Sequence, residues 1–75
     1  MNKRAGPTLR ELREQNKNTA AEVAEVLGVS DRALYHYENG KRRISFEQVL
    51  ILAKLYNETA EEIIKAQLNS CQNVR

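Results

Sequence analysis

The sequence has 75 residues, which is enough for one small domain. Its apolar residues are mainly Leu, Ile, Val and Ala, and the few Gly, Pro and aromatic residues favour helices over strands. The single cysteine, Cys71, excludes an internal disulfide framework or a cysteine-based metal site, and we expect no metal, cofactor or small-molecule substrate. No apolar segment approaches the roughly 18 residues of a membrane span, so we expect a cytoplasmic protein that does not associate with membranes.

The net charge of +2 is small, but the charges are unevenly distributed. Residues 1–17 carry five basic and two acidic side chains, and residues 18–38 carry one basic and four acidic ones. Lys41, Arg42 and Arg43 then follow as a second basic segment. Two basic segments around an acidic one suit a protein that binds phosphates at two places, although solvated helix ends and loops explain the charge pattern equally well.

Helix-start chemistry recurs along the chain. In a capping box, Ser or Thr and a Glu or Gln three residues later satisfy the free N–H groups at the start of a helix. The boxes are Thr8 with Glu11, Thr19 with Glu22, Ser45 with Gln48 and Thr59 with Glu62, and Ser30 before Asp31 supplies a fifth cap. With the apolar periodicity, they predict an all-α, compact five-helix bundle with helices near 8–16, 19–27, 30–39, 45–57 and 60–68.

The apolar side of each predicted helix gives the expected core. These residues are Leu9, Leu12, Val23, Ala24, Leu27, Leu34, Tyr37, Phe46, Val49, Leu50, Ala53, Tyr56, Ile63 and Ile64. The polar ends suggest three parts: a flexible basic N-terminal arm at 1–6, a domain at 7–68 and a flexible C-terminal tail at 69–75.

The segment from Ala20 to Tyr37 has the pattern of a helix-turn-helix. Its apolar residues fall where two helices joined by a tight turn face a common core, with Ala24 at the crossing and Gly28 in the turn. The remaining positions of the second helix of this pair are polar and share an outward face. This pattern predicts a module that binds double-stranded DNA.

The segment LGVSDRALYHYENGKRRIS, from Leu27 to Ser45, resembles the phage-repressor and Cro-type (Xre-like) helix-turn-helix family. The resemblance extends from about Leu9 to Ile64. It implies a lambda-repressor-like DNA-binding domain of five helices with the helix-turn-helix at helices 2 and 3. It further implies that helix 3 docks in the major groove and that a homodimer binds two half-sites about 34 Å apart.

The resemblance also implies base contacts from the third predicted helix, by Asp31, Arg32, Tyr35 and His36. Arg32 is the strongest candidate, because its guanidinium can donate two hydrogen bonds to guanine. Asp31 can accept from cytosine or simply be a first-turn acid, and His36 can contact DNA or be an ordinary surface residue.

The family pattern places phosphate contacts at helix starts and in the loop after the third helix. The candidates are Thr19, Ser30, Asn39, Lys41, Arg42 and Arg43, although a helix-capping role explains Asn39 equally well. Many relatives have Gln at the position of Ala20, where it contacts phosphate and braces the recognition helix. Ala20 can do neither, which puts this contact in doubt.

Two further sets of residues match structural positions. Arg13 and Glu38 stand where many relatives have a buried ion pair, the alternative being two independent exposed charges. The apolar residues Ile51, Leu55 and Leu68 either form a dimer patch or close the base of the bundle.

We therefore expect a sequence-specific transcriptional regulator, in particular a repressor that binds a palindromic operator as a homodimer. Enzymatic function is not expected, because one His, no Gly-rich phosphate loop and no clustered carboxylates leave no catalytic constellation. The alternative is a protein-interaction module, such as an antitoxin or a partner in a larger complex, with DNA binding secondary.

Overall fold

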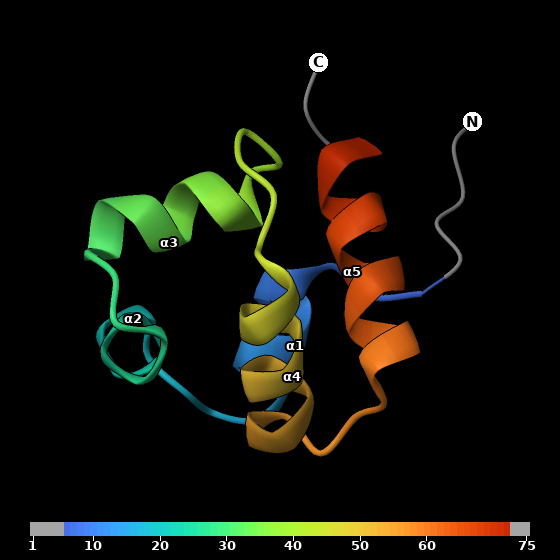
Figure 1. Ribbon diagram of the computed structural model, residues 1–75, viewed down its shortest axis with the longest axis horizontal. Helices are drawn as coiled ribbons and strands as arrows, with labels where there is room; N and C mark the ends of the chain where they lie inside the picture. The colour runs from blue at the N-terminus through green and yellow to red at the C-terminus, as the bar shows by residue number, and fades with distance from the viewer. Residues whose placement is uncertain (1–5, 73–75) are drawn as a thin grey trace.

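The computed structural model describes residues 6–72, and within them it contains five α-helices and no strand. The helices are α1 (Leu9–Gln15), α2 (Ala20–Leu27), α3 (Asp31–Glu38), α4 (Phe46–Leu55) and α5 (Ala60–Gln72). Figure 1 shows α2 end-on with α3 lying across it, α4 in front of α1, and α5 alongside them. The all-α, five-helix prediction is confirmed. None of these helices is long and apolar enough to cross a membrane.

Each helix begins directly after the residue that the capping pattern identifies as its cap. Thr8, Thr19 and Ser45 form complete capping boxes, and the Ser30 hydroxyl accepts a hydrogen bond from the Ala33 N–H. The Thr59 hydroxyl accepts from the Glu62 N–H at 3.1 Å. Helices of 7 to 13 residues are marginal on their own, so these caps fix where each one starts while packing stabilises it.

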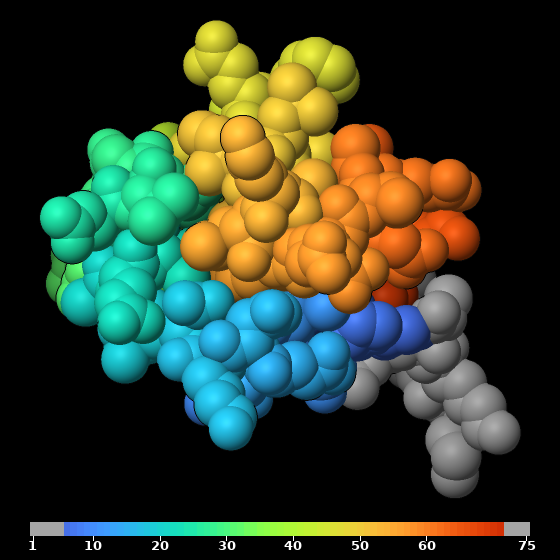
Figure 2. Space-filling view, turned by 90° about the horizontal axis from the view of Figure 1, so that it is seen from below, coloured from blue at the N-terminus to red at the C-terminus, as the bar shows by residue number. Residues whose placement is uncertain are grey.

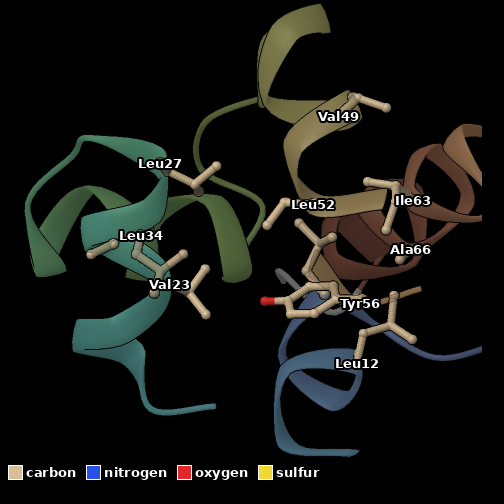
Figure 3. Packing of buried hydrophobic residues seen from close by; sticks show 11 residues of the cluster. Leu12, Val23, Leu27, Leu34, Val49, Leu52, Tyr56, Ile63 and Ala66 are labelled. Atoms are coloured by element: carbon tan, nitrogen blue, oxygen red, sulfur yellow. The ribbon is translucent and has the colours of Figure 1, made fainter. Parts of the chain in front are cut away.

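The core draws side chains from all five helices (Figure 3). Val23 and Ile63 are fully buried, and Tyr56 is 3% exposed, as the periodicity predicts. Ala24 is also buried, which lets α2 approach its neighbours closely. The buried cluster consists of Leu9, Leu12, Val23, Ala24, Leu27, Leu34, Val49, Leu52, Tyr56, Ile63 and Ala66.

Three residues predicted to be in the core are on the surface. Phe46 is 75% exposed, Leu50 is 50% exposed and Ile64 is 46% exposed, so these predictions are wrong. The buried side of α4 runs instead through Val49 and Leu52. Because consecutive helical residues differ by about 100°, Leu50 and Ile64 turn away from the core when the residue before each points into it.

The predicted flexible tail at 69–75 is wrong for its described part, because α5 continues to Gln72. Ser70 is fully buried, and its hydroxyl accepts from the Leu9 N–H at 3.1 Å. The Asn69 amide donates to the Pro7 carbonyl at 3.0 Å. These bonds satisfy polar groups inside the fold, which a hydrophobicity pattern does not detect. Residues 73–75 and nearly all of the predicted N-terminal arm, 1–5, lie outside the described residues.

Candidate nucleic-acid interface

The turn between α2 and α3 sets the direction of α3. Gly28 has φ 74°, in the left-handed region that glycine adopts without strain. The Val29 N–H donates to the Ala24 carbonyl at 2.9 Å, and Ser30 then caps α3. This tight closure lays α3 across α2 (Figure 1). The two helices form the helix-turn-helix that the sequence predicts.

The outward face of α3 carries the four predicted base-contacting residues. Asp31, Arg32 and Tyr35 are exposed, and His36 is half-buried. Leu34, which lies between Arg32 and Tyr35 in sequence, and Tyr37, which follows His36, point into the protein and are buried. Since Arg32, Tyr35 and His36 are spaced three and four residues apart, their side chains project on one side of the helix. The structure thus brings the predicted base-contacting set together.

The starts of α2 and α3 carry exposed hydroxyl groups. The Thr19 hydroxyl accepts from the Glu22 N–H at 3.1 Å, and the Ser30 hydroxyl accepts from the Ala33 N–H at 3.1 Å. Each hydroxyl keeps its own hydrogen to donate, and such a donor suits a phosphate oxygen. Ala20, where the family often has Gln, is half-buried and packs against the core. Its small side chain therefore has a packing role at the start of α2.

A basic loop, Lys41–Arg43, follows α3. The His36 carbonyl accepts from the backbone N–H groups of Lys41, at 2.9 Å, and Arg42, at 3.2 Å. The Arg42 guanidinium lies 5.5 Å from the centre of the Tyr37 ring, within range of a cation–π interaction. Figure 2 shows the part of the chain around this loop and the start of α4, in yellow, projecting from the body of the molecule.

The charges of the basic loop are available for a partner. Lys41, Arg42 and Arg43 are all exposed, and none forms an ion pair within the described residues. Asn39 is also exposed and ends α3, where its N–H donates to the Tyr35 carbonyl at 2.8 Å. It has φ −92°, so Gly40, at φ 78°, is the left-handed residue of this turn.

Arg13 and Glu38 join α1 to the end of α3. The Arg13 Nε donates to Glu38 Oε2 at 2.7 Å, and its Nη2 donates to Oε1 at 3.2 Å. The side chains are 11% and 3% exposed, so the pair is buried as the resemblance implies. The hydrogen bond that Arg13 donates to the Glu38 carboxylate raises the pKa of Arg13, which stays charged. The pair fixes the C-terminal end of α3 against α1.

The three residues of the predicted dimer patch do not form one exposed surface. Ile51 and Leu68 are exposed, but Leu55 is half-buried and packs against the core. Phe46, Leu50 and Ile64, which the sequence pattern assigns to the core, are instead exposed and belong to a larger set of apolar surface residues.

These residues and Leu68 form what we call the apolar face: Phe46, Leu50, Ile64 and Leu68. Helix α4 contributes Phe46 and Leu50, and helix α5 contributes Ile64 and Leu68; the two residues of each helix are one turn apart. The Ile44 N–H donates to Gln67 Oε1 at 2.8 Å, which places the start of α4 beside the end of α5. Gln48, on the other side of α4, contacts the Tyr37 hydroxyl of α3, so Phe46 and Leu50 lie on the side toward α5.

Comparison with known proteins identifies the class. A helix-turn-helix family model matches residues 9–63, and the chain belongs to this family, of the Xre/Cro type. No solved structure gives a significant match.

Curated relatives are provisionally named as HTH-type transcriptional regulatory proteins. The protein from Thermococcus kodakarensis is 34% identical over an alignment of 73 residues that covers 93% of this chain and 23% of the relative. The one from Methanothermobacter thermautotrophicus is 40% identical over 52 residues, 69% of this chain and 17% of the relative. The one from Pyrococcus furiosus is 38% identical over 53 residues, 71% of this chain and 17% of the relative. The chain thus spans less than a quarter of the length of these relatives.

Proposed function

We propose that this chain is the DNA-binding unit of a transcriptional regulator and reads double-stranded DNA with α3 in the major groove. The observation that carries the proposal is the outward face of α3, with Arg32 exposed in its first turn and the phosphate-binding candidates Ser30 and Asn39 at its two ends. An α-helix fits the major groove, where each base pair presents a distinct pattern of donors and acceptors.

Phosphate contacts supply most of the affinity in this proposal. Thr19 and Ser30 bind the backbone on one side of α3, and Asn39 and the basic loop bind it on the other. Because cations that neutralise phosphates release counterions, the affinity should fall steeply as the salt concentration rises. The charges of the basic loop support this role, because they are exposed and form no ion pair with any residue that the structure describes.

Base contacts supply the specificity. Arg32 donates to the O6 and N7 atoms of a guanine, and this contact discriminates against other bases by about 1–3 kcal/mol. Asp31, Tyr35 and His36 occupy the same face and contact neighbouring base edges. The buried ion pair at Glu38 supports this arrangement, since it holds α3 against α1 while its outer face stays free.

The regulator acts as a homodimer on a palindromic operator and represses by occupying it. The apolar face supports a second copy as its occupant, because exposed apolar groups clustered on one surface are typical of an interface.

Selection of bound sequences from a random DNA pool tests the proposal, and a palindromic consensus with half-sites one helical turn apart is expected. On that sequence, Arg32→Ala should lose preference at one base position. Arg42→Ala should instead weaken binding to all sequences alike and lower the salt slope by about 1. Equal losses on all DNA for both variants would contradict the division between base and phosphate contacts.

Sedimentation equilibrium tests the homodimer. Leu50→Glu places a charge on the apolar face and should give a monomer with weakened operator binding. Ile51→Glu is the matched control and should remain dimeric, because Ile51 is also exposed on α4 but lies about 100° around the helix from Leu50, outside the apolar face. A monomeric wild-type protein that selects no DNA sequence would overturn the proposal and favour the protein-interaction module.

A further inference from the structure

The last turns of α5 contact the chain at both ends of the basic loop. At one end, the Ile44 N–H donates to Gln67 Oε1 at 2.8 Å, across 23 positions of sequence. At the other end, the Cys71 thiol donates to the Gly40 carbonyl at 3.9 Å, across 31 positions. The Gln67 Nε2 also donates to Cys71 Sγ at 3.7 Å, which joins the two contacts. One turn of α5 therefore spans the ends of the segment that carries Lys41–Arg43.

Of these contacts, the bond from Ile44 to Gln67 is the stronger. An N–H to amide-oxygen bond of 2.8 Å has good length, whereas a thiol is a weak donor. Gln67 is only 6% exposed, so water competes little with its side-chain oxygen for the Ile44 N–H. Without this acceptor, the Ile44 N–H would lose its protein partner, and the loop would be held mainly at its start, by the His36 carbonyl.

The two attachments of the loop come from different parts of the fold. The His36 carbonyl and the Tyr37 ring connect its first half to α3. Gln67 connects its second half to α5, which packs against α1 and α4 and is part of the core. Held from both sides, the loop presents its three cations at a fixed place relative to α3.

We propose that Gln67 is a positioning residue for DNA binding: it holds the basic loop in place for phosphate contact without touching DNA itself. This inference rests on the proposed function. Ordering the loop before binding lowers the entropy cost of forming the phosphate contacts. Because phosphates carry no sequence information, loss of Gln67 should weaken binding to all sequences and leave the base preference unchanged.

The test compares Gln67→Met with Ser70→Ala. Gln67→Met keeps an unbranched side chain of similar length but removes the acceptor for Ile44. Ser70→Ala is the matched control, because it also removes a buried polar group of α5, one that binds the Leu9 N–H of α1 and not the loop. Both proteins are compared at equal folded fraction, using the operator selected by the wild type and an unrelated DNA duplex.

We expect Gln67→Met to bind both duplexes about tenfold more weakly, with the slope of log affinity against log salt lowered by about 1. Ser70→Ala should keep the wild-type affinity and slope. Hydrogen exchange without DNA gives an independent reading. The Ile44 N–H should be protected in the wild type and in Ser70→Ala, and should exchange much faster in Gln67→Met.

Several outcomes overturn the inference. The inference is overturned if the Ile44 N–H of the wild type exchanges as fast as that of an unstructured peptide. This result counts even if Gln67→Met fails to fold. An unchanged salt slope in Gln67→Met, an altered base preference, or an equal loss in Ser70→Ala would also overturn it. If the wild type binds no DNA, the proposed function fails as well, even where Ile44 is protected. If the wild type binds DNA but Gln67→Met shows no loss of affinity or salt slope, the proposed function stands and only the role of Gln67 is wrong.

Discussion

The buried ion pair between α1 and α3 makes Glu38→Gln the most informative stability test. The substitution keeps the shape of the side chain but removes its charge. The Arg13 side chain, which is only 11% exposed, then lacks its anionic partner. Removing one partner of a buried pair costs about 3–5 kcal/mol. Because Arg13 retains some solvent contact and a bond to the Asn18 carbonyl at 3.3 Å, we expect a loss of about 3 kcal/mol.

That loss is large for so small a protein. At about 0.05–0.15 kcal/mol per residue, the free energy of unfolding of the whole chain is on the order of 4–11 kcal/mol. Urea unfolding followed by far-UV circular dichroism should therefore show a midpoint far below that of the wild type. Exchanging both partners, as Arg13→Met with Glu38→Leu, should recover most of the loss, because no buried charge then lacks a partner.

The control is the exposed pair on α1, in which Arg10 Nε lies 3.2 Å from Glu14 Oε2. Its side chains are 64% and 54% exposed, so Glu14→Gln should cost less than about 0.5 kcal/mol. The reasoning is refuted if Glu38→Gln costs no more than Glu14→Gln, or if the Arg13 and Glu38 substitutions have additive effects.

Three further predictions concern pH and backbone conformation. Burial, aided by the charge of Glu38, raises the pKa of Tyr56 above its ordinary 10.0. The folded state therefore gains the full contribution of neutral Tyr56 to the unfolding free energy below about pH 10, and loses it as the pH rises toward the higher pKa of the folded state. Urea midpoints should fall over this pH range, and Tyr56→Phe should lessen the fall. Lys17 has φ 59°, so Lys17→Asn should raise the unfolding free energy by about 0.5 kcal/mol, and an unchanged midpoint would contradict the strain. Gly28→Ala should lower it by about 1 kcal/mol through conformation alone, since no described atom outside the two neighbouring residues lies within 4 Å of the added Cβ; an unchanged stability would argue against this reason.

The sequence predicts the helix starts well because their chemistry is local. Thr8, Thr19 and Ser45 each reach a partner three residues away, so the pattern that identifies the cap also contains the atoms that form it. The turn at Gly28 is equally local. The helix-turn-helix and its outward face follow from such short-range patterns.

The sequence predicts less well wherever a residue's environment depends on distant segments. Asn69 and Ser70 are polar and close to the end of the chain, but their partners Pro7 and Leu9 lie 62 and 61 positions earlier. Nothing local marks these two residues as buried. Leu50 and Ile64 show the opposite case, because an apolar side chain next to a core position is assigned to the core unless the orientation of the helix is known.

The candidate site divides in the same way. The exposed residues of α3 and the basic loop can be read directly from the polar positions around a predicted helix. The pairing of Arg13 with Glu38, 25 positions apart, comes only from resemblance to a family. The contact of Gln67 with Ile44 is not detectable in either way, since it depends on how α5 packs against the start of α4.

The bonds from α5 to Pro7 and Leu9 bring the two ends of the described chain together, and in Figure 1 the first described residues pass beside α5. A domain whose ends are neighbours can be inserted into a surface loop of another protein or joined in tandem without pulling its first and last elements apart. This arrangement is compatible with relatives in which the matching region is less than a quarter of the chain. For engineering, it makes the unit a candidate for transplantation between hosts.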